Sequence, residues 1–172
     1  MYARRLVARG SGSGGYTTLS LLAFRDILRC GTSVCAVSNL ETLVEHAETF
    51  EAHYMDQVLG PLPESRQLLQ ERSPCFHLDG IKRSPVLFIQ ARLDGQSSQR
   101  ETEEMMRKLR ANGVPTAMLP VEGEPYGPRI TADTQKALEA ELSFYSQVMG
   151  LTLAEPLEPV ALEPALPEPP RR

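Results

Sequence analysis

Short apolar runs alternate along the chain with longer stretches in which apolar residues recur at helical spacing. The run at 85–90 is continuously apolar, as expected of a parallel strand covered on both faces. The pattern predicts strands at 4–9, 32–37, 85–90 and 116–121, and helices at 16–29, 38–54, 64–71, 98–111 and 132–149. Strands that alternate with helices indicate an α/β fold with a small parallel sheet of four strands and flanking helices.

Two details of this pattern place side chains as well as elements. Ser38 and Glu41 have the spacing of a capping box, so a helix is expected to begin there and run to about Tyr54. In the last predicted helix, an apolar stripe should face the sheet. The stripe consists of Leu138, Leu142, Tyr145 and Met149.

The composition changes abruptly after the last predicted helix. Residues 151–172 carry Glu-Pro at 155, 158, 163 and 168, and proline at this density disfavours helix and sheet. We therefore expect one α/β domain at 1–150, followed by a disordered tail at 151–172. Pro167–Arg172 also fits the Pro-x-x-Pro-x-Arg form of an SH3 ligand.

Charge and hydropathy exclude several classes of function. The net charge is −4 and the basic residues are scattered, which disfavours a nucleic-acid partner. No apolar run is long enough to span a membrane, and the first residues lack the apolar core of a signal peptide. The expectation is a cytoplasmic chain without a membrane partner and without a cofactor.

The cysteines and histidines do not form a recognisable metal or redox motif. Cys30, Cys35 and Cys75 match no zinc or thioredoxin-like spacing, and we expect reduced structural thiols. His46 and His53 fall seven residues apart on one predicted helix among glutamates, where an exposed helix face is the expectation and a metal site the alternative. His77 is expected to pack at a strand edge.

The segment after the first predicted strand has the form of a nucleophile elbow. Such an elbow joins a strand to a helix through small residues and holds a serine above the sheet. Here the segment reads Arg-Gly-Ser-Gly-Ser-Gly-Gly-Tyr-Thr-Thr-Leu over 9–19, and no serine has glycine at both the −2 and the +2 position. It resembles the elbow of the prolyl oligopeptidase family, Arg-Gly-Gly-Ser-Ala-Gly-Gly-Tyr-Thr-Thr-Leu, and alignment without gaps puts Gly12 at the nucleophile position.

The resemblance extends over about residues 4–150 and implies the C-terminal half of an α/β-hydrolase domain. It includes the segments at 38–43, 50–54, 60–61, 72–74 and 81–87. The family's triad acid corresponds to Asp94, although the glycine of that motif is Ala91 here. The family's histidine position holds Glu124.

These substitutions imply a chain derived from a serine peptidase that hydrolyses substrates poorly or not at all. A serine nucleophile needs an imidazole to remove its proton, and Gly12 has no side chain. The amide of Ser13 would be one oxyanion donor. The alternative is a weak peptidase or esterase that uses Ser13 or Ser11; a phosphate-binding turn is disfavoured because the Lys-Ser/Thr of a P-loop is absent.

The resemblance also implies that the family's first four strands, the second oxyanion loop and the β-propeller lie outside this chain. The elbow strand, central in that family, would then have an open edge. We expect self-association, or docking to an intact homologue, through this edge. A further alternative is a fragment that does not fold alone.

Overall fold

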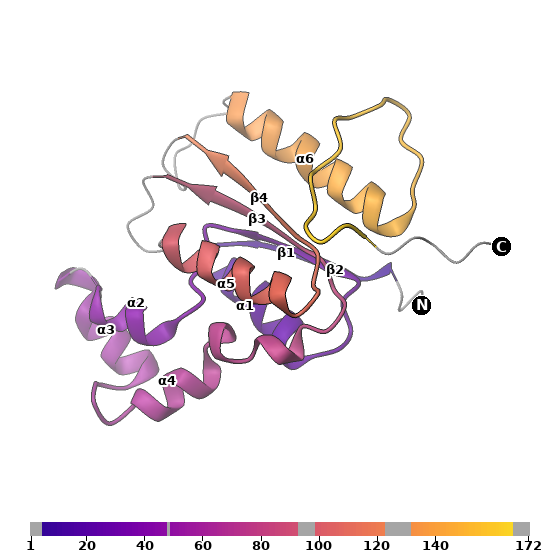
Figure 1. The fold of residues 1–172 in the computed structure, drawn as a ribbon. Helices are drawn as coiled ribbons and strands as arrows, with labels where there is room; N and C mark the ends of the chain where they lie inside the picture. The colour runs from indigo at the N-terminus through magenta and orange to yellow at the C-terminus, as the bar shows by residue number, and fades with distance from the viewer. Residues whose placement is uncertain (1–4, 48, 93–98, 123–131, 167–172) are drawn as a thin grey trace.

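A computed structural model describes residues 5–47, 49–92, 99–122 and 132–166 of the chain (Figure 1). Four strands form the sheet: β1 (Val7–Ser11), β2 (Cys30–Val34), β3 (Val86–Ala91) and β4 (Thr116–Val121). Six α-helices are described: α1 (Ser13–Phe24), α2 (Leu40–Glu45), α3 (Thr49–Leu59), α4 (Arg66–Arg72), α5 (Gln99–Ala111) and α6 (Ala132–Met149). Two short 3₁₀ turns, η2 (Pro74–Phe76) and η3 (Leu78–Gly80), precede β3.

The sheet is wholly parallel and its strands lie in sequence order, β1-β2-β3-β4. This confirms the predicted α/β architecture of four parallel strands with flanking helices. Within the described residues, β1 pairs with β2 alone, which makes β1 an edge strand. All four strands end at the same edge of the sheet because they run in one direction.

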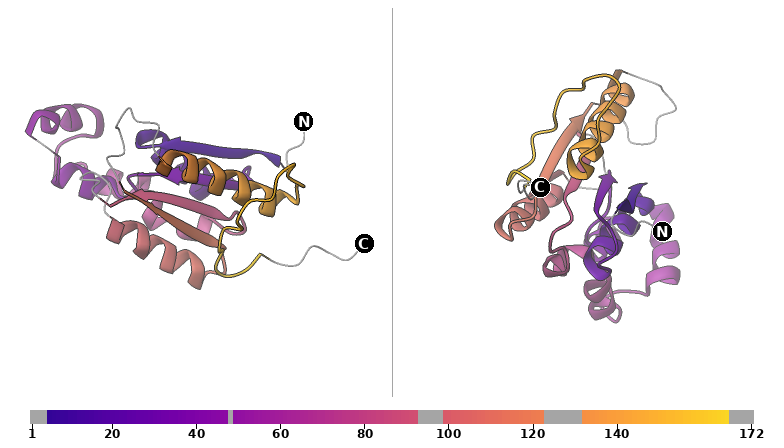
Figure 2. Two further views of the ribbon diagram at one scale, coloured as in Figure 1. Left: turned by 90° about the horizontal axis from the view of Figure 1, so that it is seen from above. Right: turned by 90° about the vertical axis from the view of Figure 1, so that its right-hand side faces the viewer.

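The helices cover the sheet on both faces, as Figure 2 shows: α1 and α5 lie on one face and α6 on the other. A hydrophobic core lies on each face of the sheet. The side chains of β3 contribute to both cores, since successive side chains of a strand point to opposite faces. Val86 and Phe88 pack with α1 and α5, whereas Leu87 and Ile89 pack with α6. Every residue of β3 is buried, as the continuous apolar run predicted.

The bounds of two early elements differ from the prediction. The first helix begins at Ser13 and ends at Phe24, so Ile27, which the predicted helix at 16–29 includes, lies beyond its end and is half exposed. Arg25 ends the helix because its backbone is extended while its amide still bonds to the carbonyl of Leu21. The second strand begins earlier than expected, at Cys30, and it ends at Val34 because Cys35 takes a positive φ of 44° directly after it.

The single helix predicted over 38–54 is two helices, α2 and α3. Asn39 caps α2 by accepting a hydrogen bond from the amide of Glu41, so the expected Ser38 capping box is wrong. Ser38 is buried instead, and its carbonyl accepts a bond from the amide of Cys75. Because Ser38 packs against η2, Asn39 rather than Ser38 caps the start of α2.

The predicted apolar stripe of α6 is also wrong in part. Leu138 and Leu142 are 55% and 50% exposed, whereas Phe144 and Val148 are buried against the sheet. The buried face includes Glu141, which is 5% exposed because Arg9 and Tyr145 satisfy its carboxylate. The face of α6 that packs on the sheet therefore differs from the face that its hydrophobic residues alone predict.

The proline-rich stretch 151–166 contains neither a helix nor a regular strand, in agreement with its proline density. It is nevertheless seated on the domain, because Val160, Leu162 and Leu166 pack on the α6 core. A single antiparallel bridge joins Glu163 to Thr116 of β4. The SH3-like segment at 167–172 lies outside the described residues.

No helix among the described residues is long and apolar enough to cross a bilayer.

Candidate active site

The turn from β1 into α1 is sharp, and Gly12 stands at its apex with φ 55° and ψ −118°. Two backbone hydrogen bonds fix it: the Gly12 amide donates to the carbonyl of Val34, and the Tyr16 amide donates to the carbonyl of Gly12, both at 3.0 Å. Residues other than glycine rarely adopt this conformation, and it costs them about 1–3 kcal/mol. The strained position of the elbow therefore falls on Gly12 and on neither adjacent serine.

Two further glycines let α1 approach the strands. A Cβ on Gly10 would lie 2.0 Å from the carbonyl oxygen of Gly14, and one on Gly15 would lie 2.6 Å from the Cβ of Ala36. Neither position has room for a side chain, because backbone or a short side chain fills it. The elbow backbone is thus intact, while its apex carries no side chain.

Ser11 and Ser13 flank the apex and are both exposed. Ser11 is the last residue of β1 and Ser13 the first of α1. The first hydrogen bond between backbone groups of the helix is that of Tyr16, so the amide of Ser13 belongs to the helix start, where the helix dipole favours negative charge. This is the location expected of an oxyanion donor.

Asp94 and Glu124 lie outside the described residues. The strands that lead to them end at the same edge as β1, and the Arg92 amide donates to the carbonyl of Val121 at 3.2 Å. An exposed ion pair, 3.6 Å between Arg92 and Glu122, joins the first residues after these two strands. The structure thus brings together the starts of the two segments that lead to Asp94 and Glu124.

His77 lies between η2 and η3 rather than at a strand edge, and its ring packs on Phe24 with centroids 4.9 Å apart. Phe24 ends α1, a helix of 12 residues and therefore about 18 Å long, so His77 lies at the end of α1 away from Gly12.

The other two histidines are on different elements, so their expected placement on one helix is wrong. His46 caps the end of α2, where its Nδ1 lies 2.9 Å from the carbonyl oxygen of Thr42, and His53 is in α3. Among the residues that the structure describes, no group of three or more His, Cys, Asp or Glu side chains is placed to hold a metal ion.

The three cysteines form no disulfide, and the surroundings of two of them, Cys30 and Cys75, favour the neutral thiol. Burial raises the pKa of Cys30 to about 12, and burial together with the nearby Glu101 raises that of Cys75 to about 11. Because the thiolate is the reactive form, neither of these two thiols is activated at neutral pH. Cys35 is buried at the end of β2, where its Sγ accepts a hydrogen bond from the amide of Ala91 at 3.3 Å.

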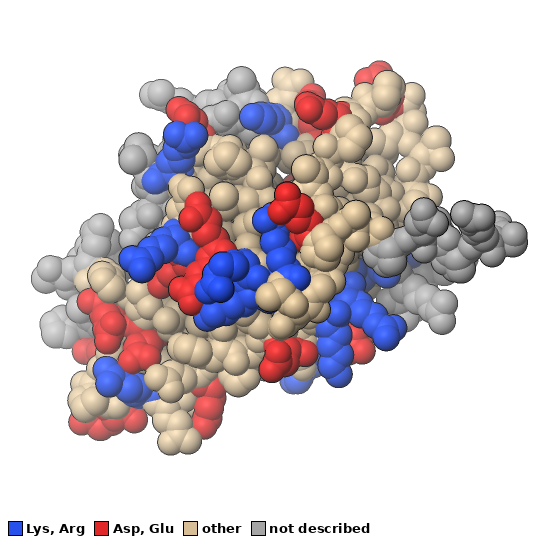
Figure 3. Space-filling view, in the orientation of Figure 1, with Lys and Arg blue, Asp and Glu red and all other residues tan. Residues whose placement is uncertain are grey.

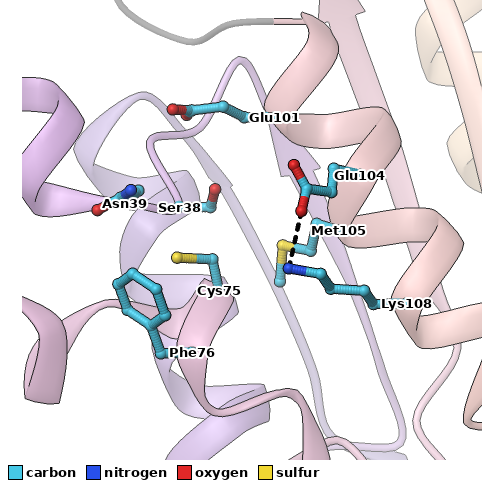
Figure 4. A pocket seen from close by; sticks show the side chains of 8 residues that line it. All are labelled: Ser38, Asn39, Cys75, Phe76, Glu101, Glu104, Met105 and Lys108. Atoms are coloured by element: carbon cyan, nitrogen blue, oxygen red, sulfur yellow. Dashed lines mark ion pairs between the residues drawn. The ribbon is translucent and has the colours of Figure 1, made fainter.

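A hollow of about 140 Å³ lies between α5, η2 and the loop into α2 (Figure 4). An ion pair of 2.9 Å between Glu104 and Lys108 borders it, and the neutral Cys75 thiol is on its wall. No sequence motif indicates this hollow, because its residues come from three separate segments. Its side chains are Ser38, Asn39, Cys75, Phe76, Glu101, Glu104, Met105 and Lys108.

Acidic and basic side chains are interspersed on the face that Figure 3 shows, including the area over α5. This face therefore has no broad basic area of the kind that follows a nucleic-acid backbone.

Comparison with known proteins agrees with the geometry of the elbow. The family model described as the prolyl oligopeptidase family matches residues 1–152. A dipeptidyl aminopeptidase BIII of Pseudoxanthomonas mexicana is 30% identical over 157 residues, which is 86% of this chain and 22% of that protein. A dipeptidyl peptidase family member 6 of Caenorhabditis elegans is 27% identical over 148 residues, or 82% of this chain and 20% of that protein.

Solved structures give the same result. A puromycin-hydrolysing peptidase of Mycobacterium tuberculosis has a TM-score of 0.85 and 33% identity, over 94% of this chain and 24% of that one. A puromycin hydrolase has a TM-score of 0.83 and 31% identity, over 93% of this chain and 24% of that one. The chain spans about a quarter of the length of these relatives. With an intact elbow turn and a family match over nearly its whole length, the chain belongs to the prolyl oligopeptidase family of serine peptidases.

Proposed function

We propose that this chain is a non-catalytic member of its peptidase family. One observation carries the proposal: the strained apex of the elbow, φ 55° and ψ −118°, is at Gly12, which has no side chain to act as a nucleophile. Serine hydrolysis needs a hydroxyl at this apex and an imidazole within hydrogen-bond reach of it. The sequence supports the loss of both groups, because Glu124 replaces the family's histidine.

A carboxylate at position 124 is a poor substitute for imidazole. The ordinary pKa of a glutamate is about 4.3, so a carboxylate binds a proton weakly at neutral pH and would return it to a leaving group inefficiently. Asp94 keeps the acid of the triad, but an acid that orients a histidine has no role when the histidine is absent.

The test is covalent labelling by a fluorophosphonate probe, which reacts only with activated serines. We expect no labelling of the natural chain and no cleavage of a fluorogenic dipeptide amide. Gly12→Ser alone should also remain unlabelled, since no base would activate the new hydroxyl. Serine-specific labelling of the natural chain that Ser11→Ala or Ser13→Ala abolishes would overturn the proposal.

That last outcome would establish the alternative function, a weak peptidase or esterase. One observation favours it: Ser11 and Ser13 are both exposed beside the apex, and Ser13 begins α1. The matched control for Ser13→Ala is Thr17→Ala, one helical turn further along α1. The Thr17 hydroxyl donates to the carbonyl of Ser13 at 3.0 Å, so removing it perturbs the turn without removing a serine.

The non-catalytic role that the described surface favours is association through the edge strand β1. Arg9 of β1 bonds to Glu141 of α6, and near Glu141 on the same helix Leu138 and Leu142 are each about half exposed. The partner would be a second copy or an intact homologue, whose strand would pair with β1 beneath these leucines. Light scattering on the purified chain tests this, and a strictly monomeric chain that captures no tagged homologue would remove the role.

A further inference from the structure

The outer edge of β4 holds the tail in the manner of an added strand. Glu163 and Thr116 exchange two backbone hydrogen bonds, of 2.9 and 3.0 Å, in an antiparallel bridge. Residues 160–163 alternate between facing the sheet core and facing outward, so Val160 and Leu162 pack on the α6 core while Ala161 and Glu163 face α5. This is the side-chain pattern of a strand with one face on a core.

Arg110 of α5 recognises this bridge from the other face. Its Nη1 lies 2.6 Å from the Glu163 carboxylate, and its Nε donates to the Thr116 hydroxyl at 2.9 Å. A single arginine thus contacts both residues of the bridge, one through charge and one through a neutral hydroxyl. The guanidinium fork suits this double contact because it presents several donors in one plane.

One further contact and the position of the prolines define how the segment lies. The Ser143 hydroxyl donates to the carbonyl of Glu158 at 2.8 Å, so α6 holds the segment five residues before Glu163. Proline sets the limits of pairing, since Pro159 and Pro164 enclose the proline-free residues 160–163 and Pro120 of β4 has no amide to donate. The site therefore accommodates a short strand between two prolines.

We infer that the β4 edge with Arg110 is a docking site for an extended segment of the pattern Val-x-Leu-Glu-Pro. The tail occupies the site in cis, and a segment of the same chemistry in a partner protein can replace it. A groove between α5 and β4 continues from Ala161 over Met106 and Met118 and is bordered by Arg107, Arg110 and one acid, Glu103. The apolar floor and the two arginines suit an acidic segment with apolar residues at alternate positions. Docking at this edge is independent of any loss of catalysis at the elbow.

The experiment uses the full chain and a fluorescent peptide with the sequence of residues 157–166. The natural chain should bind the peptide weakly, because a tethered segment competes at an effective concentration on the order of millimolar. Leu162→Asp should displace the cis segment and increase peptide binding at least about tenfold. Adding Arg110→Gln to that variant should weaken binding about threefold to fivefold, whereas adding Arg100→Gln, on the same helix, should not.

Hydrogen exchange at the Thr116 amide provides a readout that does not depend on the peptide's fluorescence. The Thr116 amide should lose its protection from exchange in the Leu162→Asp chain, and saturating peptide should restore that protection. A folded Leu162→Asp chain that does not bind the peptide would overturn the inference, as would unchanged binding in the Arg110→Gln variant. If the natural chain is a dimer and excess peptide dissociates it, the site binds the tail of a second copy. That result would overturn the cis arrangement.

Discussion

The Nε of Arg9 on β1 lies 3.1 Å from both carboxylate oxygens of Glu141 on α6. Glu141 also accepts a hydrogen bond of 2.9 Å from the Tyr145 hydroxyl, which lies 2.7 Å from that of Thr32 on β2. Because the single Tyr145 proton goes to Glu141, Thr32 donates to Tyr145. This network joins α6 to the first two strands, directly beside the open edge of the sheet.

Glu141→Ala should destabilise the fold by about 2–3 kcal/mol, since it leaves the part-buried Tyr145 hydroxyl without its acceptor. Glu141→Gln retains an oxygen acceptor and should cost about 1 kcal/mol. Urea denaturation measures both differences. The control is Glu104→Gln, which removes an exposed ion pair with Lys108 and should leave the free energy of unfolding nearly unchanged. Equal losses for Glu141→Ala and the control would contradict a structural role for the network.

Gly10→Ala should destabilise the fold by about 3 kcal/mol or more, because the new Cβ would lie 2.0 Å from the Gly14 carbonyl oxygen. The matched control is Gly14→Ala on the other side of the apex, where nothing lies within 4 Å of the added Cβ. That change should be neutral, or stabilising by up to about 1 kcal/mol, because it restricts the unfolded chain. Thermal unfolding distinguishes the two, and similar melting temperatures would mean that the elbow backbone is not packed as described.

Stability should decrease above about pH 9, and Cys30 should account for part of the decrease. Burial raises the pKa of its thiol from 9.0 to about 12. Between these values the folded chain retains a proton that the unfolded chain has released, so the stabilisation is complete below pH 9 and decreases as the pH rises toward 12. The expected slope is about 1.4 kcal/mol per pH unit for one such group.

The variant Cys30→Ala should reduce that slope. The packing lost in this variant lowers its free energy of unfolding equally at all pH values. The two chains are therefore compared by the slope of that free energy between about pH 9 and 10.5. Cys75 and Tyr145, whose pKa values burial also raises, should preserve a smaller decrease in this variant. Identical slopes for the two chains would show that Cys30 is not buried in the neutral form.

The double variant Leu138→Lys/Leu142→Lys should abolish association through the β1 edge without unfolding the chain. Both side chains are about half exposed, so the substitutions bury no charge in the monomer, whereas they would do so in the paired assembly. Light scattering at several concentrations gives the mass, and circular dichroism verifies the fold. The control is Leu68→Lys on α4, an exposed leucine on an element outside the sheet. An assembly that survives the double variant would place the contact elsewhere.

The sequence by itself determined the parallel α/β sheet, the strand-glycine-helix form of the elbow and the family, because these depend on local period and on short motifs. Its alignment to the family also predicts that Gly12 is the nucleophile position; the structure shows that Gly12 lies at the apex of the turn between β1 and α1. Only the tertiary structure decided that Glu141 is buried and Leu138 exposed, since the position of Arg9 on a strand 132 residues away determines which face of α6 meets the sheet. The same holds for the tail: proline density correctly disfavours regular structure, but Arg110, the backbone bridge to Thr116 and the packing of its apolar residues on the α6 core hold it on β4.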